Sequence, residues 1–261
     1  MLDIIHISKT FNPGTVNEKK AICDLSLHLD KGDFVTIIGS NGAGKSTLFN
    51  AISGSFYTDE GNIILNDKDI TLMPEHKRAQ IIGRLFQDPM RGSAPGMTIE
   101  ENMALACGGG GWLHYLNKAE KEEFRERLSR LGMGLEDRMK QPVGLLSGGQ
   151  RQALTLLMAT AIPPQLLLLD EHTAALDPAT ADKVIEITRQ VVAEHNITCM
   201  MVTHNMHQAL EMGNRTIMMS EGNIVFDVKG EERAGMTVND LLDKFKEGTG
   251  HTLDNDRMLL S

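Results

Sequence analysis

Residues 39–47 read Gly39-Ser40-Asn41-Gly42-Ala43-Gly44-Lys45-Ser46-Thr47 and match the pattern G-x-x-x-x-G-K-[ST]. The run before them, residues 33–38 (DFVTII), is short, apolar and β-rich, as expected of a buried parallel strand. After Lys45 the composition becomes helical and this stretch stops at Gly54. A strand that enters a glycine turn and a helix that leaves it are the context in which this pattern forms a phosphate-binding loop.

The loop has the chemistry of a nucleoside triphosphate site. Its glycines let backbone N–H groups approach phosphate oxygens, and the helix N-terminus adds about half a positive charge. Lys45 can reach the β- and γ-phosphates, and the Ser46 hydroxyl can ligate Mg²⁺. The alternative is a glycine-rich turn that binds nothing, and the agreement of the pattern with both flanks disfavours it.

The composition indicates one large domain or two small ones in 261 residues, with 41% hydrophobic residues to build a core. No apolar run approaches the ~18–20 residues of a membrane span, and residues 1–6 do not resemble a secretory signal. Cys23, Cys107 and Cys199 are far apart, which favours reduced cytosolic thiols over disulfides or a metal site. A net charge of −9 argues against nucleic acid as a main partner.

Strands and helices alternate along most of the chain. We expect strands at 2–8, 21–29, 81–86, 166–169, 197–202, 216–219 and 224–226, and a hairpin with a glycine turn at Gly61 before 62–66. We expect helices at 74–80, 150–162, 178–195, 205–212 and 237–246.

Residues 88–145 differ from this pattern, and we interpret them as a helical insert in an α/β core. The segment 98–106 is helical in composition, with Thr98 and Glu101 spaced as a capping box. A second, charged helix is expected at 118–131. Four glycines at 108–111 read as a flexible connection within the insert.

Four leucines at 166–169 end in the carboxylates Asp170 and Glu171. Ligands of parallel sheets bind at the carboxyl ends of the strands, so Asp170 would lie near the phosphate loop if the two strands are neighbours. Asp170 would then hold the Mg²⁺ shell, and Glu171 would polarise the attacking water as general base. The alternative is a strand that merely stops at two acids.

The stretch Leu146-Ser147-Gly148-Gly149-Gln150 precedes the expected buried helix. Serine is a good helix cap, and the two glycines leave backbone amides bare as a second anion site. From physics alone, a capped helix after a loop remains an alternative.

With L-S-G-G-Q lying between a phosphate loop and an apolar run ending in Asp-Glu, the chain resembles the ATP-binding-cassette (ABC) family over essentially its whole length. The resemblance implies an α/β fold: a P-loop NTPase core with a mixed sheet, an N-terminal antiparallel β subdomain and the helical insert. It implies a single ATPase domain at 1–247, followed by a polar tail at 248–261.

Four further site residues follow from the resemblance alone. Gln87 matches the Q-loop glutamine that contacts Mg²⁺ and water, and Asp177 matches the D-loop aspartate that works across a dimer interface. His204 matches the switch histidine on the γ-phosphate, and Phe11 matches the aromatic residue that stacks on adenine. Taken singly, these residues could be a surface glutamine, a helix cap, a structural histidine and a core phenylalanine.

The resemblance also implies how the site is assembled. Lys45, Glu171 and His204 are the expected catalytic residues, and the expected metal ligands are Ser46, Gln87 and Asp170. ATP would lie between the phosphate loop of one copy and Ser147 to Gln150 and Asp177 of another, in a two-fold dimer. Where the family commonly has Asp-Glu-Pro-Thr, this chain has His172, which we expect to loosen the turn slightly without loss of activity.

The loop at residues 11–20 and the run Asp170-Glu171-His172-Thr173 resemble those of ATPase subunits for amino-acid uptake, of the tryptophan/tyrosine or branched-chain type. This resemblance implies an ATP-hydrolysing subunit on the inner face of the cell membrane, with a separate integral permease and, indirectly, an extracytoplasmic solute-binding protein. Two alternatives stay open: a soluble ABC ATPase such as a sulfur-mobilisation ATPase, and a degenerate cassette that binds ATP and only signals.

Overall fold

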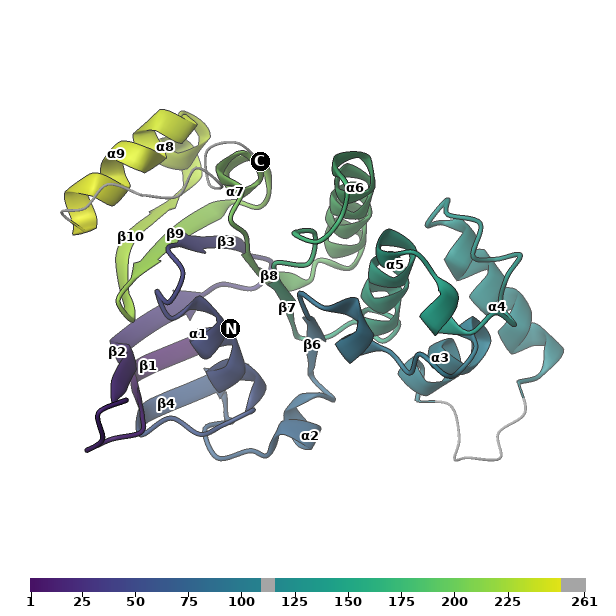
Figure 1. Ribbon diagram of the computed structural model, residues 1–261, viewed down its shortest axis with the longest axis horizontal. Helices are drawn as coiled ribbons and strands as arrows, with labels where there is room; N and C mark the ends of the chain where they lie inside the picture. Colours follow the sequence, from purple (N-terminus) through teal and green to yellow (C-terminus); the bar gives the residue numbers. More distant parts are fainter. Residues whose placement is uncertain (109–115, 250–261) are drawn as a thin grey trace.

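The computed structural model describes residues 1–108 and 116–249, which form two β-sheets with surrounding helices (Figure 1). The strands are β1 (Leu2–Phe11), β2 (Lys19–Leu29), β3 (Phe34–Gly39), β4 (Glu60–Leu65), β5 (Lys68–Asp69), β6 (Ile82–Leu85), β7 (Leu166–Asp170), β8 (Thr198–Val202), β9 (Arg215–Ser220) and β10 (Asn223–Lys229). The α-helices are α1 (Lys45–Ser53), α2 (Glu75–Arg78), α3 (Ile99–Ala106), α4 (Lys118–Ser129), α5 (Gly148–Ala159), α6 (Pro178–His195), α7 (Met206–Glu211), α8 (Gly230–Ala234) and α9 (Val238–Thr249), and two short 3₁₀ helices are η1 (Pro89–Gly92) and η2 (Val143–Leu145).

The larger sheet has six strands in the order β10-β9-β3-β8-β7-β6. Its strands are parallel except β10, which pairs antiparallel with β9 at the edge. Every residue of β3 and the four leucines of β7 are buried, which accounts for their continuous apolar sequence. β8 lies between β3 and β7, so the two strands are not neighbours and the condition under which we expected Asp170 near the phosphate loop is not met. Crossover connections let a strand that comes later in the chain enter between two earlier ones, and local sequence does not reveal this.

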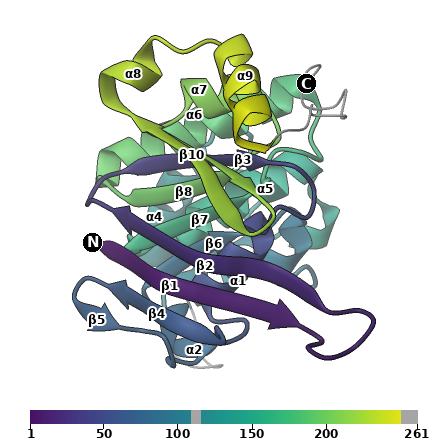
Figure 2. The same ribbon diagram turned by 90° about the vertical axis from the view of Figure 1, so that its left-hand side faces the viewer.

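The smaller sheet is antiparallel, with the order β2-β1-β4-β5, and Figure 2 shows β1 and β2 side by side. The hairpin expected at Gly61 is wrong, because its turn lies at Asn66 and Asp67, between β4 and β5. Both turn residues have positive φ angles of 47° and 62°, as a two-residue turn of this hand requires. Gly61 lies instead inside β4, where a Cβ atom would sit 2.3 Å from the carbonyl oxygen of His6.

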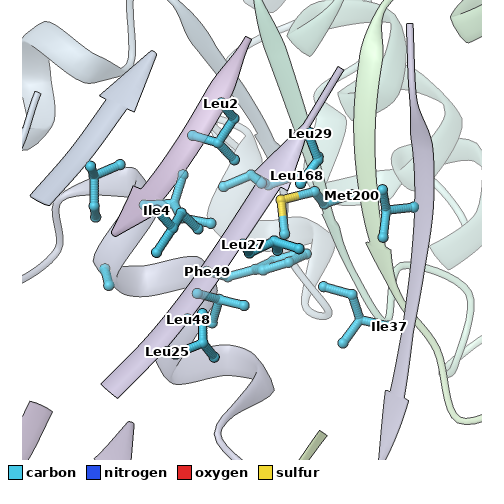
Figure 3. Packing of buried hydrophobic residues seen from close by; sticks show 14 of the residues in the cluster. Leu2, Ile4, Leu25, Leu27, Leu29, Ile37, Leu48, Phe49, Leu168 and Met200 are labelled. Carbon is cyan, nitrogen blue, oxygen red and sulfur yellow. The ribbon is translucent and has the colours of Figure 1, made fainter. Parts of the chain in front are cut away.

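The first core is shared by the two sheets and α1. Leu48 and Phe49 of α1 are fully buried in it, between Leu27 of the antiparallel sheet and Leu168 and Met200 of the large sheet (Figure 3). Burial of such side chains contributes roughly 1.5–3 kcal/mol each. The helix that follows the phosphate loop is therefore held from both sides.

The second core lies on the other face of the large sheet, where α3, α4, α5 and α6 pack (Figure 1). The capping box of α3 is confirmed, since Thr98 and Glu101 each accept from the other's backbone N–H. The second helix of the expected insert begins after Asn117 and ends at Ser129. Of the four glycines only Gly108 is a described residue, and the extent of the insert, 88–145, stays an interpretation.

The final helix, α9, runs to Thr249, past the expected end at residue 246. Leu241 and Phe245 of α9 are buried with Ile38 and Met218 in a third core cluster. α9 thus reaches two residues into the stretch that we read as a polar tail, and residues 250–261 lie outside the described part of the chain. No helix within residues 1–108 and 116–249 has the length and apolarity needed to cross a membrane.

Candidate functional site

The phosphate loop leaves β3 at Gly39 and enters α1 at Lys45, as expected. Gly44, the N-cap of α1, has a φ of 105°, and a Cβ atom there would lie 2.6 Å from the carbonyl oxygen of Ala21. Only glycine fits this position, which explains the second glycine of the pattern. The close approach to Ala21 also packs the loop against β2 of the antiparallel sheet.

The Lys45 side chain is 5% exposed and folds back onto its own loop. Its Nζ donates hydrogen bonds to the carbonyl oxygens of Gly39 (2.7 Å) and Ser40 (3.0 Å). Burial lowers the pKa of Lys45, and the charges of Glu171 and Asp170 oppose this shift. The ammonium group therefore lies within electrostatic reach of both carboxylates, although β8 separates β3 from β7.

Asp170 is the last residue of β7, and Glu171 follows it with a left-handed φ of 46°. Burial raises the pKa of Asp170, against the opposing charge of Arg84. Burial also raises the pKa of Glu171, but the hydrogen bond and charge of His204, with the charge of Lys45, outweigh it, so the net shift is downward. Glu171 is thus kept ionised beside a half-buried Asp170.

His204 follows β8, the strand next to β7, and contacts Glu171 directly. Its Nε2 lies 2.5 Å from Glu171 Oε1, and the two side chains are 28% and 13% exposed. Two residues that the sequence placed in one site are therefore joined by a hydrogen bond. The sequence did not predict this contact.

Ser147 and Gln150 form a capping box at the start of α5. The Ser147 hydroxyl accepts from the Gln150 N–H, and the Gln150 side chain accepts from the Ser147 N–H and donates to the carbonyl oxygen of Met133. The capped helix that we considered from physics alone is present. Gly148 and Gly149 lie in the first turn of α5, where backbone N–H groups have no acceptor within the helix and can bind an anion.

α5 and α1 lie on opposite faces of the large sheet (Figure 1). Leu166 and Leu168 of β7 belong to the core that contains α1, whereas Leu167 and Leu169 belong to the core that contains Leu154 of α5. The phosphate loop and the Ser147 cap thus start helices that the sheet separates.

The other three expected residues lie outside the Lys45 cluster. Gln87 is exposed between β6 and η1, and Asp177 caps α6 by accepting from the Thr180 N–H at 3.1 Å. Phe11 ends β1 and meets Phe56 edge-on, with 5.4 Å between ring centroids. Within the described parts of the chain, no hydrogen bond or ion pair joins Gln87, Ser147 or Asp177 to the cluster of Lys45, Asp170, Glu171 and His204.

His172 stands where the family commonly has proline, and it is anchored to α6. Its imidazole is 3% exposed, and its Nε2 lies 3.2 Å from the Thr188 hydroxyl of α6. Burial lowers the pKa of His172 to about 4, so the ring is neutral at pH 7. The contact with Thr188 ties the residue after Glu171 to α6, and the slightly looser turn stays an expectation.

Arg84 was not among the site residues expected from the sequence, yet its guanidinium lies 3.5 Å from the Asp170 carboxylate. A charged residue in the middle of the apolar run 81–86 is the signal that could have found it. A buried arginine needs acceptors, and a nearby carboxylate is the strongest of them.

A model of the ABC transporter family matches residues 22–174, more than half of the chain. The chain belongs to the ABC transporter family. It is 45% identical over 249 residues to a tyrosine transport ATP-binding protein of Clostridioides difficile, covering 94% of this chain and 99% of that protein. It is 36% identical to the carnitine transport ATP-binding protein OpuCA of Listeria monocytogenes, over 88% of this chain and 56% of that protein.

The structure is similar to the ATP-binding cassette MJ0796 in a dimeric post-hydrolysis state with ADP and Pi. The TM-score is 0.76 at 26% identity, over 88% of this chain and 98% of that one. The expected fold class is confirmed: the core is a P-loop cassette with an antiparallel β sheet and a mixed sheet. The ABC protein is an ATPase, as the resemblance implied.

Proposed function

We propose that this ABC ATPase is the energy-converting subunit of a solute importer. The observation that carries the proposal is the meeting of Lys45, Asp170, Glu171 and His204 beyond the ends of three parallel strands, β3, β7 and β8. A cation that binds phosphate, two carboxylates and a histidine are the groups that hydrolysis of a γ-phosphate requires.

In this proposal Lys45 moves its Nζ from the carbonyl oxygens of Gly39 and Ser40 to the β- and γ-phosphates of ATP. Glu171 is the general base: its Oε1 is held by His204, and its Oε2 accepts the proton of the attacking water. The imidazole of His204 orients the carboxylate and contacts the γ-phosphate. Phe11 would stack on adenine, which requires its ring to keep one face clear of Phe56.

The donor set fits Mg²⁺, which would neutralise charge on the β- and γ-phosphates when bound. Ser46 offers a hydroxyl, Gln87 an amide oxygen and Asp170 a carboxylate, which are hard oxygen ligands. Among the described residues no group of three His, Cys, Asp or Glu side chains could hold a metal alone. Magnesium held by one carboxylate together with substrate phosphates needs no such group.

We propose that two copies complete two sites. The phosphate loop and the Ser147 cap begin helices on opposite faces of the sheet, which favours the use of Ser147 to Gln150 and Asp177 by a neighbouring copy. The similar MJ0796 structure is a dimer with ADP and Pi. ATP would then close the dimer and hydrolysis would reopen it.

The solute is proposed to be an amino acid or a related small zwitterion. One relative is named for tyrosine and another for carnitine, and both compounds carry a carboxylate and a positively charged nitrogen. The pore would be a separate integral permease, fed by an extracytoplasmic binding protein, with the ATPase peripheral on the inner face of the membrane. This ATPase would drive import, in line with the resemblance to uptake subunits.

Copurification tests the proposal against a soluble ABC ATPase of the sulfur-mobilisation type. The ATPase is purified in mild detergent from membranes of its own cells, and the bound proteins are identified. An integral permease that stays bound and stimulates ATP hydrolysis supports transport. A water-soluble scaffold complex in place of a permease would rule it out, and failure of both the dimer and the permease complex to hydrolyse ATP would favour a signalling cassette.

A further inference from the structure

Arg84 lies on β6, the strand next to β7, and its side chain is 11% exposed. Its Nη1 donates to the Ser53 hydroxyl and its Nη2 to Asn50 Oδ1, both at 2.8 Å. The same Nη2 lies 3.5 Å from Asp170 Oδ2. One guanidinium thus joins the last turn of α1 to the end of β7.

The sheet register places Arg84 on the face that carries α1. Arg84 pairs with Leu168, whose side chain belongs to the core shared with α1. Neighbouring residues in a ladder point to the same face of the sheet, so Arg84 reaches Asn50 and Ser53 without crossing the sheet. The position of Asp170 is thereby tied to the helix that starts at the phosphate loop.

Arg84 also supports the chain that leads to Gln87. Its guanidinium carbon lies 4.6 Å from the centre of the Phe86 ring, which a second cation, Arg91, approaches at 5.0 Å. Cation–π contacts of this kind hold a ring in place. Three parts of the proposed nucleotide site, α1, Asp170 and the start of the Q-loop, therefore meet at one side chain.

A fully buried arginine, Arg78, shows what a purely structural role looks like. Arg78 is 1% exposed and donates only to backbone carbonyls, those of Ala51, Ile52, Thr71 and Met73. Arg84 instead uses side-chain acceptors, and its buried Nε has no hydrogen-bond partner among residues 1–108 and 116–249. An incompletely paired buried guanidinium is poorly explained by stability alone.

We propose that Arg84 is a positioning residue for Asp170. Its contact is with Oδ2, so Oδ1 remains for the Mg²⁺ that Asp170 is proposed to bind. The inference rests on the proposed function, in which Asp170 is a metal ligand. It predicts that Arg84 affects the metal-dependent part of nucleotide binding and leaves the metal-independent part unchanged.

The experiment measures binding of a fluorescent ATP analogue to the purified protein, in EDTA and across a Mg²⁺ titration. Arg84→Met should raise the Mg²⁺ concentration at half-maximal effect by about 10–100-fold, the usual effect of losing a group that orients a metal ligand. In EDTA, the affinity of Arg84→Met for the ATP analogue should equal that of the wild type. Arg84→Lys should lie between the two, because a single ammonium cannot reach Ser53, Asn50 and Asp170 as the two nitrogens of the guanidinium do.

Arg91→Met isolates the Phe86 contact, since it removes the other cation on Phe86 and does not touch Asp170; its Mg²⁺ titration should shift much less than that of Arg84→Met. If Arg84→Met does not fold, Asn50→Ala removes the α1 anchor of Nη2 and should shift the titration in the same direction. If the Arg84 or Asn50 variant folds and its Mg²⁺ titration is unchanged, the positioning role of Arg84 is overturned, while the proposed function stands. A wild-type protein that ignores Mg²⁺ overturns the metal site of the proposed function, and Arg84's role with it.

Discussion

His204 Nε2 lies 2.5 Å from Glu171 Oε1, and this contact joins the residues that follow two neighbouring parallel strands, β8 and β7. Because His204 lowers the pKa of Glu171 against the effect of burial, the pair keeps a carboxylate ionised where burial alone would favour its neutral form. An ionised glutamate within electrostatic reach of Lys45 is the basis of the first two predictions.

Glu171→Gln should abolish most turnover while ATP binding persists. Removing a general base typically costs about 10²–10⁴-fold in rate, and the amide keeps the shape of the side chain. ATP hydrolysis is measured as phosphate release, and dimer formation by light scattering with ATP present. We expect a trapped dimer, and Glu186→Gln on the exposed face of α6 serves as control. Normal hydrolysis by Glu171→Gln would exclude Glu171 as the base.

His204→Ala should move the acid limb of the kcat profile to higher pH. The folded-state pKa of Glu171 is lowered by His204, so removing the imidazole raises that pKa and the carboxylate is protonated earlier as pH falls. The exposed His207, three residues along, is the control, and His207→Ala should leave the profile in place. An acid limb that stays where it is in His204→Ala would contradict the pairing.

His172 should make the fold sensitive to mild acid. Its pKa falls from 6.5 to about 4 on burial, so the unfolded chain binds the proton first and stability is lost as pH falls from about 6.5 toward 4. The loss is at most about 3 kcal/mol. Urea unfolding at pH 7 and pH 5 measures it, with His172→Gln as a variant that cannot titrate. Equal acid sensitivity of the two proteins would show that His172 does not carry the effect.

Mixing two inactive variants should restore hydrolysis if each site is shared between copies. Lys45→Ala damages the phosphate loop and Ser147→Arg blocks the cap, so each homodimer has two damaged sites. A mixed dimer has one intact site, made of Lys45 from one copy and Ser147 from the other, and random mixing restores up to about a quarter of the wild-type sites. No recovery after verified subunit exchange would place Lys45 and Ser147 in the same subunit's site.

Local features were predictable where neighbouring residues decide them. The strand, glycine turn and helix around Lys45 lie where expected, and α6 spans Pro178–His195 as predicted. Capping boxes such as Thr98 with Glu101 join residues three apart, so their spacing is visible in the chain. The turn at Asn66 was missed because Gly61 carries the stronger turn signal, while its actual role is a close approach to β1.

By itself the sequence determined the phosphate loop, the capped helix at Ser147, the acids that end β7 and, through their order, the family. These patterns are local, and propensity and capping act within a few residues. Only the tertiary structure decided that β8 lies between β3 and β7, that His204 meets Glu171, and that Arg84 joins Asp170 to α1. Those contacts arise from strand order and burial between distant segments, which no local pattern encodes.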